Sequence, residues 1–332
     1  MSGHRSWHGR LAGVIAVACA IGACPAAAQT DAAAGFPKQP IKMLVGLAAG
    51  SINDIQGRVI AAKLAERLGV PVVMENKVGA GGNIAAEFVA RANPDGYTLL
   101  VAPTSTLTVN PAVYAKLGYD PQKDFVPVTQ ISAYQLYLTV NADSPAKTVP
   151  ELVALAKAQP EKANLGSPST VFELVTAVFM QRTGTKFETI PFKGTNETMT
   201  ALLTNQIMIA WQDYNSLTPQ LKAGKIRVLA TSGSRRSSVL PEAATFAELG
   251  LPGVELDPLT GIVAPKATPA AIVRKLQTEI QAVLKQPDVA ERWTSLAMTP
   301  VGNTSEEFAA LIDREIKRWT EVAKAANIKL EQ

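Results

Sequence analysis

Strand-like and helix-like segments alternate along most of this chain, and this alternation limits the possible folds more than any other sequence feature. An apolar run at residues 41–47 is followed by a helix-periodic segment at 54–68. Strand-like runs at 71–75 and 97–102 then flank a helical segment at 83–92. Strands that are joined through helices form parallel sheets with helices on both faces. The sequence therefore predicts an α/β fold.

A second α/β set lies inside the chain, and its position predicts two domains. Its strands are expected at 187–191, 207–211 and 226–230, with helices at 149–158, 172–182, 197–204 and 217–223. A strand at 261–264 and three helices follow, so the tail is expected to rejoin the first set. The 332 residues are enough for two cores. We expect domain 1 at 36–138 plus 260–332 and domain 2 at 139–259, with a hinge that the chain crosses twice beside a cleft.

The first 28 residues have the pattern of a cleavable signal peptide. Two arginines precede an apolar run at 11–23, and the small residues at 26–28 suit a signal peptidase. The run is shorter than the roughly 20 residues that span a bilayer, which argues against a membrane anchor. Lipidation at Cys24 is an alternative, but Pro25 follows that cysteine and favours simple cleavage. We therefore expect an exported, periplasmic protein.

Cysteine and histidine occur only within that leader. Both cysteines, Cys19 and Cys24, and both histidines, His4 and His8, lie in residues 1–28. The remaining chain lacks the Ser-His-Asp and Cys-His arrangements of many enzymes and the usual ligands of zinc and copper. We expect no metal, no cofactor and no enzymatic activity.

The charge of the chain is balanced. Lys and Arg number 32 and Asp and Glu number 28, and without the two leader arginines the count is 30 against 28. The one basic cluster is the pair Arg235 and Arg236. Nucleic-acid binding needs a basic face, so we expect no nucleic-acid partner.

Six loops carry the candidate ligand-binding residues, and each lies where a predicted strand ends or a predicted helix begins. In open α/β sheets, ligands bind beyond the carboxyl ends of strands, where free N–H groups of helix starts attract carboxylates. Hydroxyl groups donate and accept hydrogen bonds, so they suit oxyanions without adding charge. The candidates are Leu47, Ala48, Gly50, Ser51, Asn53, Asp54, Gly81, Gly82, Asn83, Thr104, Ser105, Thr106, Ser167, Ser169, Thr170, Lys193, Gly194, Trp211, Gln212 and Asp213.

Each loop also has an ordinary structural interpretation. The loop at 47–54 fits a capped turn, and the glycine-rich loop at 79–83 fits a tight turn. The second loop has Ile84 where a dinucleotide fingerprint needs its last glycine, and it lacks the lysine of a P-loop. The hydroxyl-rich loops fit helix caps, Lys193 fits a solvated side chain, and Trp211 fits either the core or a wall of the cleft.

A series of short motifs resembles the Bug-type receptors of tripartite tricarboxylate transporters, a group of periplasmic solute-binding proteins. The resemblance covers residues 36–328. The motifs are F-P-K-Q-P-I at 36–41, P-V-V-M-E-N at 71–76, G-A-G-G-N-I at 79–84, P-D-G-Y-T-L-L at 94–100, N-P-A-V-Y at 110–114, Y-D-P-Q-K-D-F at 119–125, P-F-K-G at 191–194, K-A-G-K-I-R-V-L-A at 222–230 and E-L-G-L-P-G at 248–253.

This resemblance implies a Venus flytrap of the periplasmic binding protein type II fold. It also implies that the first two loops of domain 1 hold a ligand carboxylate through backbone N–H groups and bridging waters, and that domain 2 closes over the other end. The implied partners are a small carboxylated ligand and the membrane permease subunits of a tripartite tricarboxylate-type transporter. We expect the receptor itself to be a monomer.

The chain departs from the family pattern at the ligand loops. The first loop usually reads V-P-F-A-P-G-G-x-x-D, whereas residues 45–54 read V-G-L-A-A-G-S-I-N-D. Glu173 falls near a position where relatives often carry histidine, and Trp211-Gln212 replaces Phe-Asp. We expect a C4–C6 dicarboxylate or an aromatic carboxylate as ligand.

Two other functions stay open at this point. The same fold serves as a ligand-sensing subunit for a signalling receptor, and only the partner separates that role from transport. An enzyme based on carboxylates alone would need two placed acids, and Asp54 and Asp213 are the candidate pair.

Overall fold

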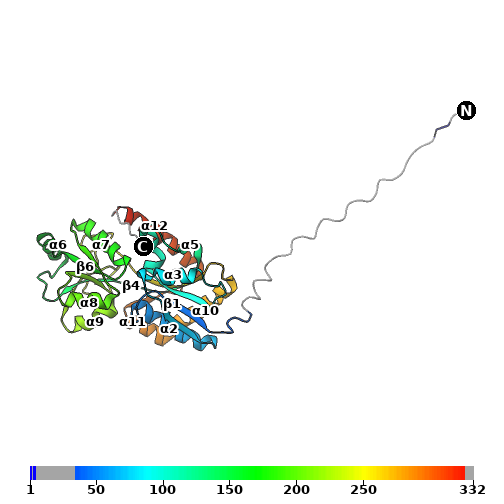
Figure 1. The fold of residues 1–332 in the computed structure, drawn as a ribbon, viewed down its shortest axis with the longest axis horizontal. Helices are drawn as coiled ribbons and strands as arrows, with labels where there is room; N and C mark the ends of the chain where they lie inside the picture. Colours follow the sequence, from blue (N-terminus) through cyan, green and yellow to red (C-terminus); the bar gives the residue numbers. More distant parts are fainter. Residues whose placement is uncertain (2, 5–33, 326–332) are drawn as a thin grey trace.

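The structure is a computed structural model that describes residues 1, 3–4 and 34–325. Figure 1 shows two lobes side by side, each built around one β-sheet with helices on its faces. Of the predicted signal peptide, only residues 1 and 3–4 are described. The rest of it lies outside the described residues, and so does Cys24, the alternative lipidation site. Within the described ranges, no helix has the length and apolar character needed to cross a membrane.

The first lobe contains a mixed six-stranded sheet in the order β11-β4-β10-β3-β1-β2. The strands β1, β2 and β3 run parallel, as predicted, whereas β10 and β11 add antiparallel pairings with β3 and β4. The strands are β1 (Ile41–Val45), β2 (Val72–Asn76), β3 (Thr98–Pro103), β4 (Phe125–Tyr134), β10 (Leu259–Pro265) and β11 (Met298–Pro300).

Helices cover both faces of this sheet because its strands are apolar on both sides. On β1, Met43 and Val45 belong to one core cluster and Leu44 to the cluster on the opposite face, as the alternation of strand side chains requires. The helical segments are α2 (Ile52–Leu68), η1 (Ala80–Gly82), α3 (Asn83–Ala90), η2 (Ser105–Val109), α4 (Asn110–Val113), α5 (Pro121–Asp124), α10 (Ala270–Leu284), α11 (Pro287–Ser295) and α12 (Ser305–Ala325).

The second lobe contains a five-stranded sheet in the order β7-β6-β8-β5-β9. Its strand β6 pairs parallel with β7 and β8, and β5 pairs antiparallel with β8 and β9. The elements are β5 (Tyr137–Asn141), α6 (Val149–Ala158), β6 (Asn164–Ser167), α7 (Thr170–Thr183), β7 (Glu188–Pro191), α8 (Thr195–Leu203), β8 (Ile209–Gln212), α9 (Tyr214–Lys222) and β9 (Ile226–Thr231).

The chain passes between the two sheets at 135–136 and again at 232–258. The first predicted boundary, after residue 138, falls inside β5. Tyr137 pairs with Gln212 and Thr231 of the second sheet, so the sequence prediction set this boundary about three residues too late. Adjacent apolar strands look alike in sequence, and only their pairing assigns them to different sheets. We propose to divide the lobes at Gln135 and before β10.

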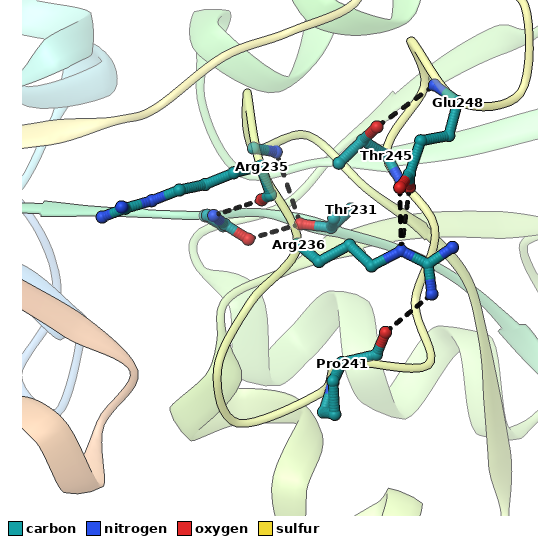
Figure 2. A network of polar contacts seen from close by, with 8 residues as sticks. Thr231, Arg235, Arg236, Pro241, Thr245 and Glu248 are labelled. Atoms are coloured by element: carbon teal, nitrogen blue, oxygen red, sulfur yellow. Dashed lines mark hydrogen bonds and ion pairs between the residues drawn. The ribbon is translucent and has the colours of Figure 1, made fainter.

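Figure 2 shows the polar contacts that hold the second crossing in place. The Arg236 Nε atom lies 3.0 Å from both carboxylate oxygens of Glu248, and its Nη1 donates to the Pro241 carbonyl at 2.8 Å. The amide of Gln135, in the first crossing, donates to the Arg235 carbonyl at 2.9 Å. The two crossing segments are therefore bonded to each other, through the backbone carbonyl of Arg235, and the Arg236 side chain bonds within the second crossing.

The last helix, α12, touches both lobes. Its Trp319 and Ala323 belong to the core cluster of the second lobe, together with Val109 and Val113 of the first lobe. Arg318 donates from Nη2 to the Glu255 carbonyl at 2.6 Å. The lobes are thus joined by an apolar contact as well as by the two crossings.

Candidate ligand-binding cleft

A cavity lies between the lobes, and segments of both lobes form its wall. Its water-accessible volume is about 60 Å³, so the lobes lie close together around it. The lining residues are Leu47, Ala48, Ser51, Ile52, Asn53, Pro103, Thr104, Ser105, Tyr134, Leu136, Pro168, Ser169, Val171, Phe172, Lys193, Gly194, Thr195, Asp213 and Pro258.

Helix N-termini converge on this cavity. The first lobe contributes the start of α2, with Ser51 as N-cap, and the second lobe contributes the starts of α7 and α8. Among the described residues, Ser169, the N-cap of α7, makes no side-chain capping hydrogen bond, and the N-cap of α8, Gly194, has no side chain to make one. The first N–H groups of a helix have no partner inside the helix, and the helix dipole makes that end positive. The cavity is therefore suited to an anion such as a carboxylate.

A charged network supports the first cleft loop from behind. The Asp54 carboxylate accepts hydrogen bonds from Gly50 N at 2.9 Å, Arg58 Nε at 3.0 Å and Asn76 Nδ2 at 2.9 Å. Burial raises the pKa of Asp54, but these hydrogen bonds and the charge of Arg58 outweigh it and lower the pKa below 3.8. Asn76 also donates to the Leu47 carbonyl at 3.0 Å. Asp54 thus stays ionised and shapes the loop, and it does not line the cavity.

Asp213 is the buried ionisable residue of the cavity wall. It caps α9, accepting from Ser216 N at 3.0 Å and from Ser216 Oγ at 2.9 Å, and burial raises its pKa. The charge of Asp213 also acts on Tyr134: burial is the larger cause, and the Asp213 charge the smaller cause, of a raised pKa of the Tyr134 hydroxyl. Lys193 is exposed at the edge of the cavity. Asp54 stands behind the first loop while Asp213 faces the cavity, so the two acids do not form a facing pair.

The structure brings half of the predicted ligand residues to the cavity and leaves the other half outside its lining. The first group is Leu47, Ala48, Ser51, Asn53, Thr104, Ser105, Ser169, Lys193, Gly194 and Asp213. The second group is Gly50, Asp54, Gly81, Gly82, Asn83, Thr106, Ser167, Thr170, Trp211 and Gln212.

The glycine-rich loop is outside the lining because it supports the first loop. A Cβ atom on Gly46 would lie 2.4 Å from the Cα atom of Gly82, so the two loops pack backbone against backbone. Asn83 and Thr106 are buried beneath this contact. Gly50 N is bonded to Asp54, and the Ser167 hydroxyl is bonded to the Ser169 carbonyl and to Glu173. These positions shape the loops that carry the lining.

The interpretation of Trp211 as a wall of the cleft is wrong. Its side chain is fully buried, donates from Nε1 to Thr176 Oγ1 at 2.8 Å and packs on Phe246 at a centroid distance of 5.5 Å. Gln212 points to the opposite face, where its Nε2 donates to Thr198 Oγ1 at 3.0 Å. Helices cover both faces of β8, so both side chains are taken up by packing.

The predicted set of ligand residues leaves out nine residues of the lining. They are Ile52, Pro103, Tyr134, Leu136, Pro168, Val171, Phe172, Thr195 and Pro258. Ile52, Pro168 and Thr195 lie inside the predicted loops. Pro103 ends strand β3, and Val171 and Phe172 lie at the start of α7, so position beside the loops was an available signal. Tyr134, Leu136 and Pro258 lie at the crossings, and their role depends on where the hinge falls. Among the described residues, no group of His, Cys, Asp and Glu could hold a metal ion.

Comparison with known proteins identifies the family. The profile of TctC, the tripartite tricarboxylate transporter family receptor, matches residues 56–328. The chain is 37% identical over 313 residues to the UPF0065 protein in the gbd 5'region of Cupriavidus necator, covering 92% of this chain and 93% of that protein. It is 32% identical over 324 residues to Protein BugT of Bordetella pertussis, covering 97% of this chain and 98% of that protein.

Solved structures agree with this result. R. palustris Rpa4515 with adipate has a TM-score of 0.85 at 31% identity, covering 90% of this chain and 100% of that chain. MatC from Rhodopseudomonas palustris with bound malate has a TM-score of 0.82 at 32% identity, covering 86% of this chain and 99% of that chain. The two lobes thus form the predicted type II periplasmic binding protein fold, and the chain belongs to the TctC family of tripartite tricarboxylate transporter receptors, which includes the Bug proteins.

Proposed function

We propose that this protein is a periplasmic receptor that holds a small carboxylate between its lobes and delivers it to a tripartite tricarboxylate-type permease. The observation that supports this most is the convergence of the α2, α7 and α8 N-termini on one cavity. Helix starts from opposite lobes favour a ligand with an anionic group at one or both ends. An anion that bridges the lobes binds the closed arrangement best and therefore shifts the protein toward it.

The lining supports a dicarboxylate or an aromatic carboxylate. Ile52, Val171 and Phe172 offer apolar contact for a carbon chain or ring, while Ser51, Ser105 and other neutral groups offer hydrogen bonds. Two related structures hold adipate and malate, which are dicarboxylates. The protein binds this ligand without chemical turnover and acts as a monomer after its signal peptide is removed.

The test is a thermal-shift screen of protein purified from the periplasm, followed by calorimetric titration. The panel contains adipate, malate, succinate, citrate, benzoate and phthalate, with hexane-1,6-diol as the uncharged match of adipate. A ligand that binds only the folded state stabilises that state and so raises the melting temperature. At a ligand concentration of 100 times Kd, the added free energy of unfolding is about 2.7 kcal/mol. We expect a carboxylate to bind and the diol to fail. Equal binding of acid and diol, or binding of neither, would contradict the proposal.

A further inference from the structure

A buried hydrogen bond joins the two lobes beside the cavity. The Thr170 hydroxyl, on the first residue of α7, donates to the side-chain Oδ1 of Asn110, on the first residue of α4, at 2.5 Å. Thr170 is 5% exposed and Asn110 is fully buried. The bond therefore connects the second lobe to the first where water does not compete for it.

The first lobe holds Asn110 in one orientation. Its Nδ2 donates to Asn83 Oδ1 at 2.6 Å, which turns Oδ1 of Asn110 toward Thr170. Asn83 Oδ1 also accepts from the Tyr119 hydroxyl at 3.2 Å, and that hydroxyl lies 2.8 Å from the Thr106 carbonyl. The Oδ1 atom of Asn110 is thus held in place to accept a hydrogen bond from the other lobe.

The surroundings of this bond are apolar. Val109 and Val113 of the first lobe share one core cluster with Val171, Phe172 and Trp319. A hydrogen bond in such surroundings is stronger than one in water, and its loss leaves buried polar atoms without partners. The bond fixes the position of α7 more firmly than an exposed contact would.

Thr170 lies between the residues through which α7 lines the cavity. Ser169 precedes it, Val171 and Phe172 follow it, and all three line the wall. Ser169 makes no side-chain capping bond, and Phe172 N donates to the Ser169 carbonyl at 3.0 Å, so the earlier N–H groups of α7, those of Thr170 and Val171, are the ones available to a ligand. The hydrogen bond between Thr170 and Asn110 fixes the position of those N–H groups relative to the first lobe.

We propose that Asn110 is a positioning residue for ligand binding, acting through Thr170 to hold the N-terminus of α7 against the ligand. This inference rests on the proposed carboxylate-binding function. It adds a residue that does not touch the ligand, and it explains why Asn83 is buried under the glycine-rich loop without lining the cavity.

The test uses near-isosteric variants of Thr170 in the full exported protein. Thr170→Val removes the hydroxyl at constant shape, and Thr170→Ser restores it. Thr183→Val, at the other end of α7, is the matched control, because its hydroxyl bonds only within the lobe, to Phe179 O at 2.7 Å and to Thr185 Oγ1. Calorimetric Kd values for adipate and malate are measured well below each melting temperature. Loss of one buried hydrogen bond predicts a Kd roughly 3- to 10-fold weaker for Thr170→Val, with Thr170→Ser and Thr183→Val within about 2-fold of wild type.

A double-mutant cycle with Asn110→Ala tests whether Asn110 acts through Thr170. If it does, Thr170→Val weakens binding no further once Asn110→Ala is present. Additive losses, an unchanged Kd in Thr170→Val, or an equal loss in Thr183→Val would overturn the inference. If the wild type binds no carboxylate, the proposed function fails instead, so the two failures are distinguishable.

Discussion

The side-chain amide of Asn53 donates a 2.7 Å hydrogen bond to the hydroxyl of Thr260, which lies 207 residues further along the chain. Asn53 lines the cavity, while Thr260 stands outside the lining, at the start of β10. Both side chains are buried. The bond thus ties the first cleft loop to the strand on which the chain returns from the second lobe.

Thr260→Val should therefore damage the cleft without touching the ligand. The buried Asn53 amide loses its partner, so the free energy of unfolding should fall by about 1–3 kcal/mol, and the Kd for a bound carboxylate should rise. Urea denaturation and calorimetry measure the two effects. Thr299→Val, on the exposed face of β11 in the same sheet, is the control and should change neither quantity. A Thr260→Val protein as stable as this control would show that the bond is dispensable.

Asp213→Asn should strengthen the binding of simple carboxylates. Burial raises the pKa of Asp213, so folding disfavours its charged form, and that cost disappears as the pH falls through the raised value. Asparagine keeps the cap of α9 but removes the negative charge that repels an anionic ligand. At pH 7, the Kd for adipate should be roughly 3- to 10-fold tighter in the variant, and the gap should close toward acid pH. Weaker binding by Asp213→Asn would mean instead that the carboxylate accepts a hydrogen bond from the ligand.

Asp54→Asn should lower stability at neutral pH more than at acid pH. The folded-state pKa of Asp54 lies below 3.8, so its ionised network stabilises the fold above about pH 4 and is lost as the pH falls through the lowered value. Arg58 is half exposed, with 51% of its side chain accessible, so solvent screening limits its contribution to the stabilisation. We expect a loss of about 1–3 kcal/mol at pH 7 by urea denaturation, shrinking at pH 3. The same loss at both pH values would show that the carboxylate charge is not involved.

Trp211→Phe should separate stability from ligand binding. The indole N–H loses its bond to Thr176, and a smaller ring leaves space against Phe246. The free energy of unfolding should fall by about 1–3 kcal/mol, while the Kd for a carboxylate stays within about 2-fold of wild type. A large loss of affinity with unchanged stability would contradict this prediction and would indicate that Trp211 contacts the ligand.

The sequence predicted local elements well because the signals are local. Thr148 precedes α6, and its hydroxyl accepts from Glu151 N, as the N-cap rule predicts. Strand and helix alternation gave the α/β class, and two of the predicted loops of the first lobe, at 47–54 and 104–106, contribute residues to the cavity lining. The antiparallel pairings of β10 and β11 were not visible, because pairing joins segments that are far apart in the chain.

The errors at the site share a physical cause. Trp211 and Gln212 lie at a strand end where both faces are covered, and alternation alone does not show which face meets a cavity. Asn83 and Thr170 lie outside the lining, and both bond to Asn110, which belongs to the same lobe as Asn83 and to the opposite lobe from Thr170. Contacts between lobes depend on how the lobes close, and local sequence patterns do not predict that arrangement.

A crystal structure of the protein with bound adipate would show directly whether a dicarboxylate bridges the two lobes. One carboxylate is expected within hydrogen-bonding distance of the backbone N–H groups at the start of α2, near Ser51 and Asn53. The other carboxylate is expected at the start of α7 or α8, with the carbon chain against Ile52 and Phe172. Adipate bound outside this cavity, or held there with both carboxylates away from the helix starts, would contradict this prediction.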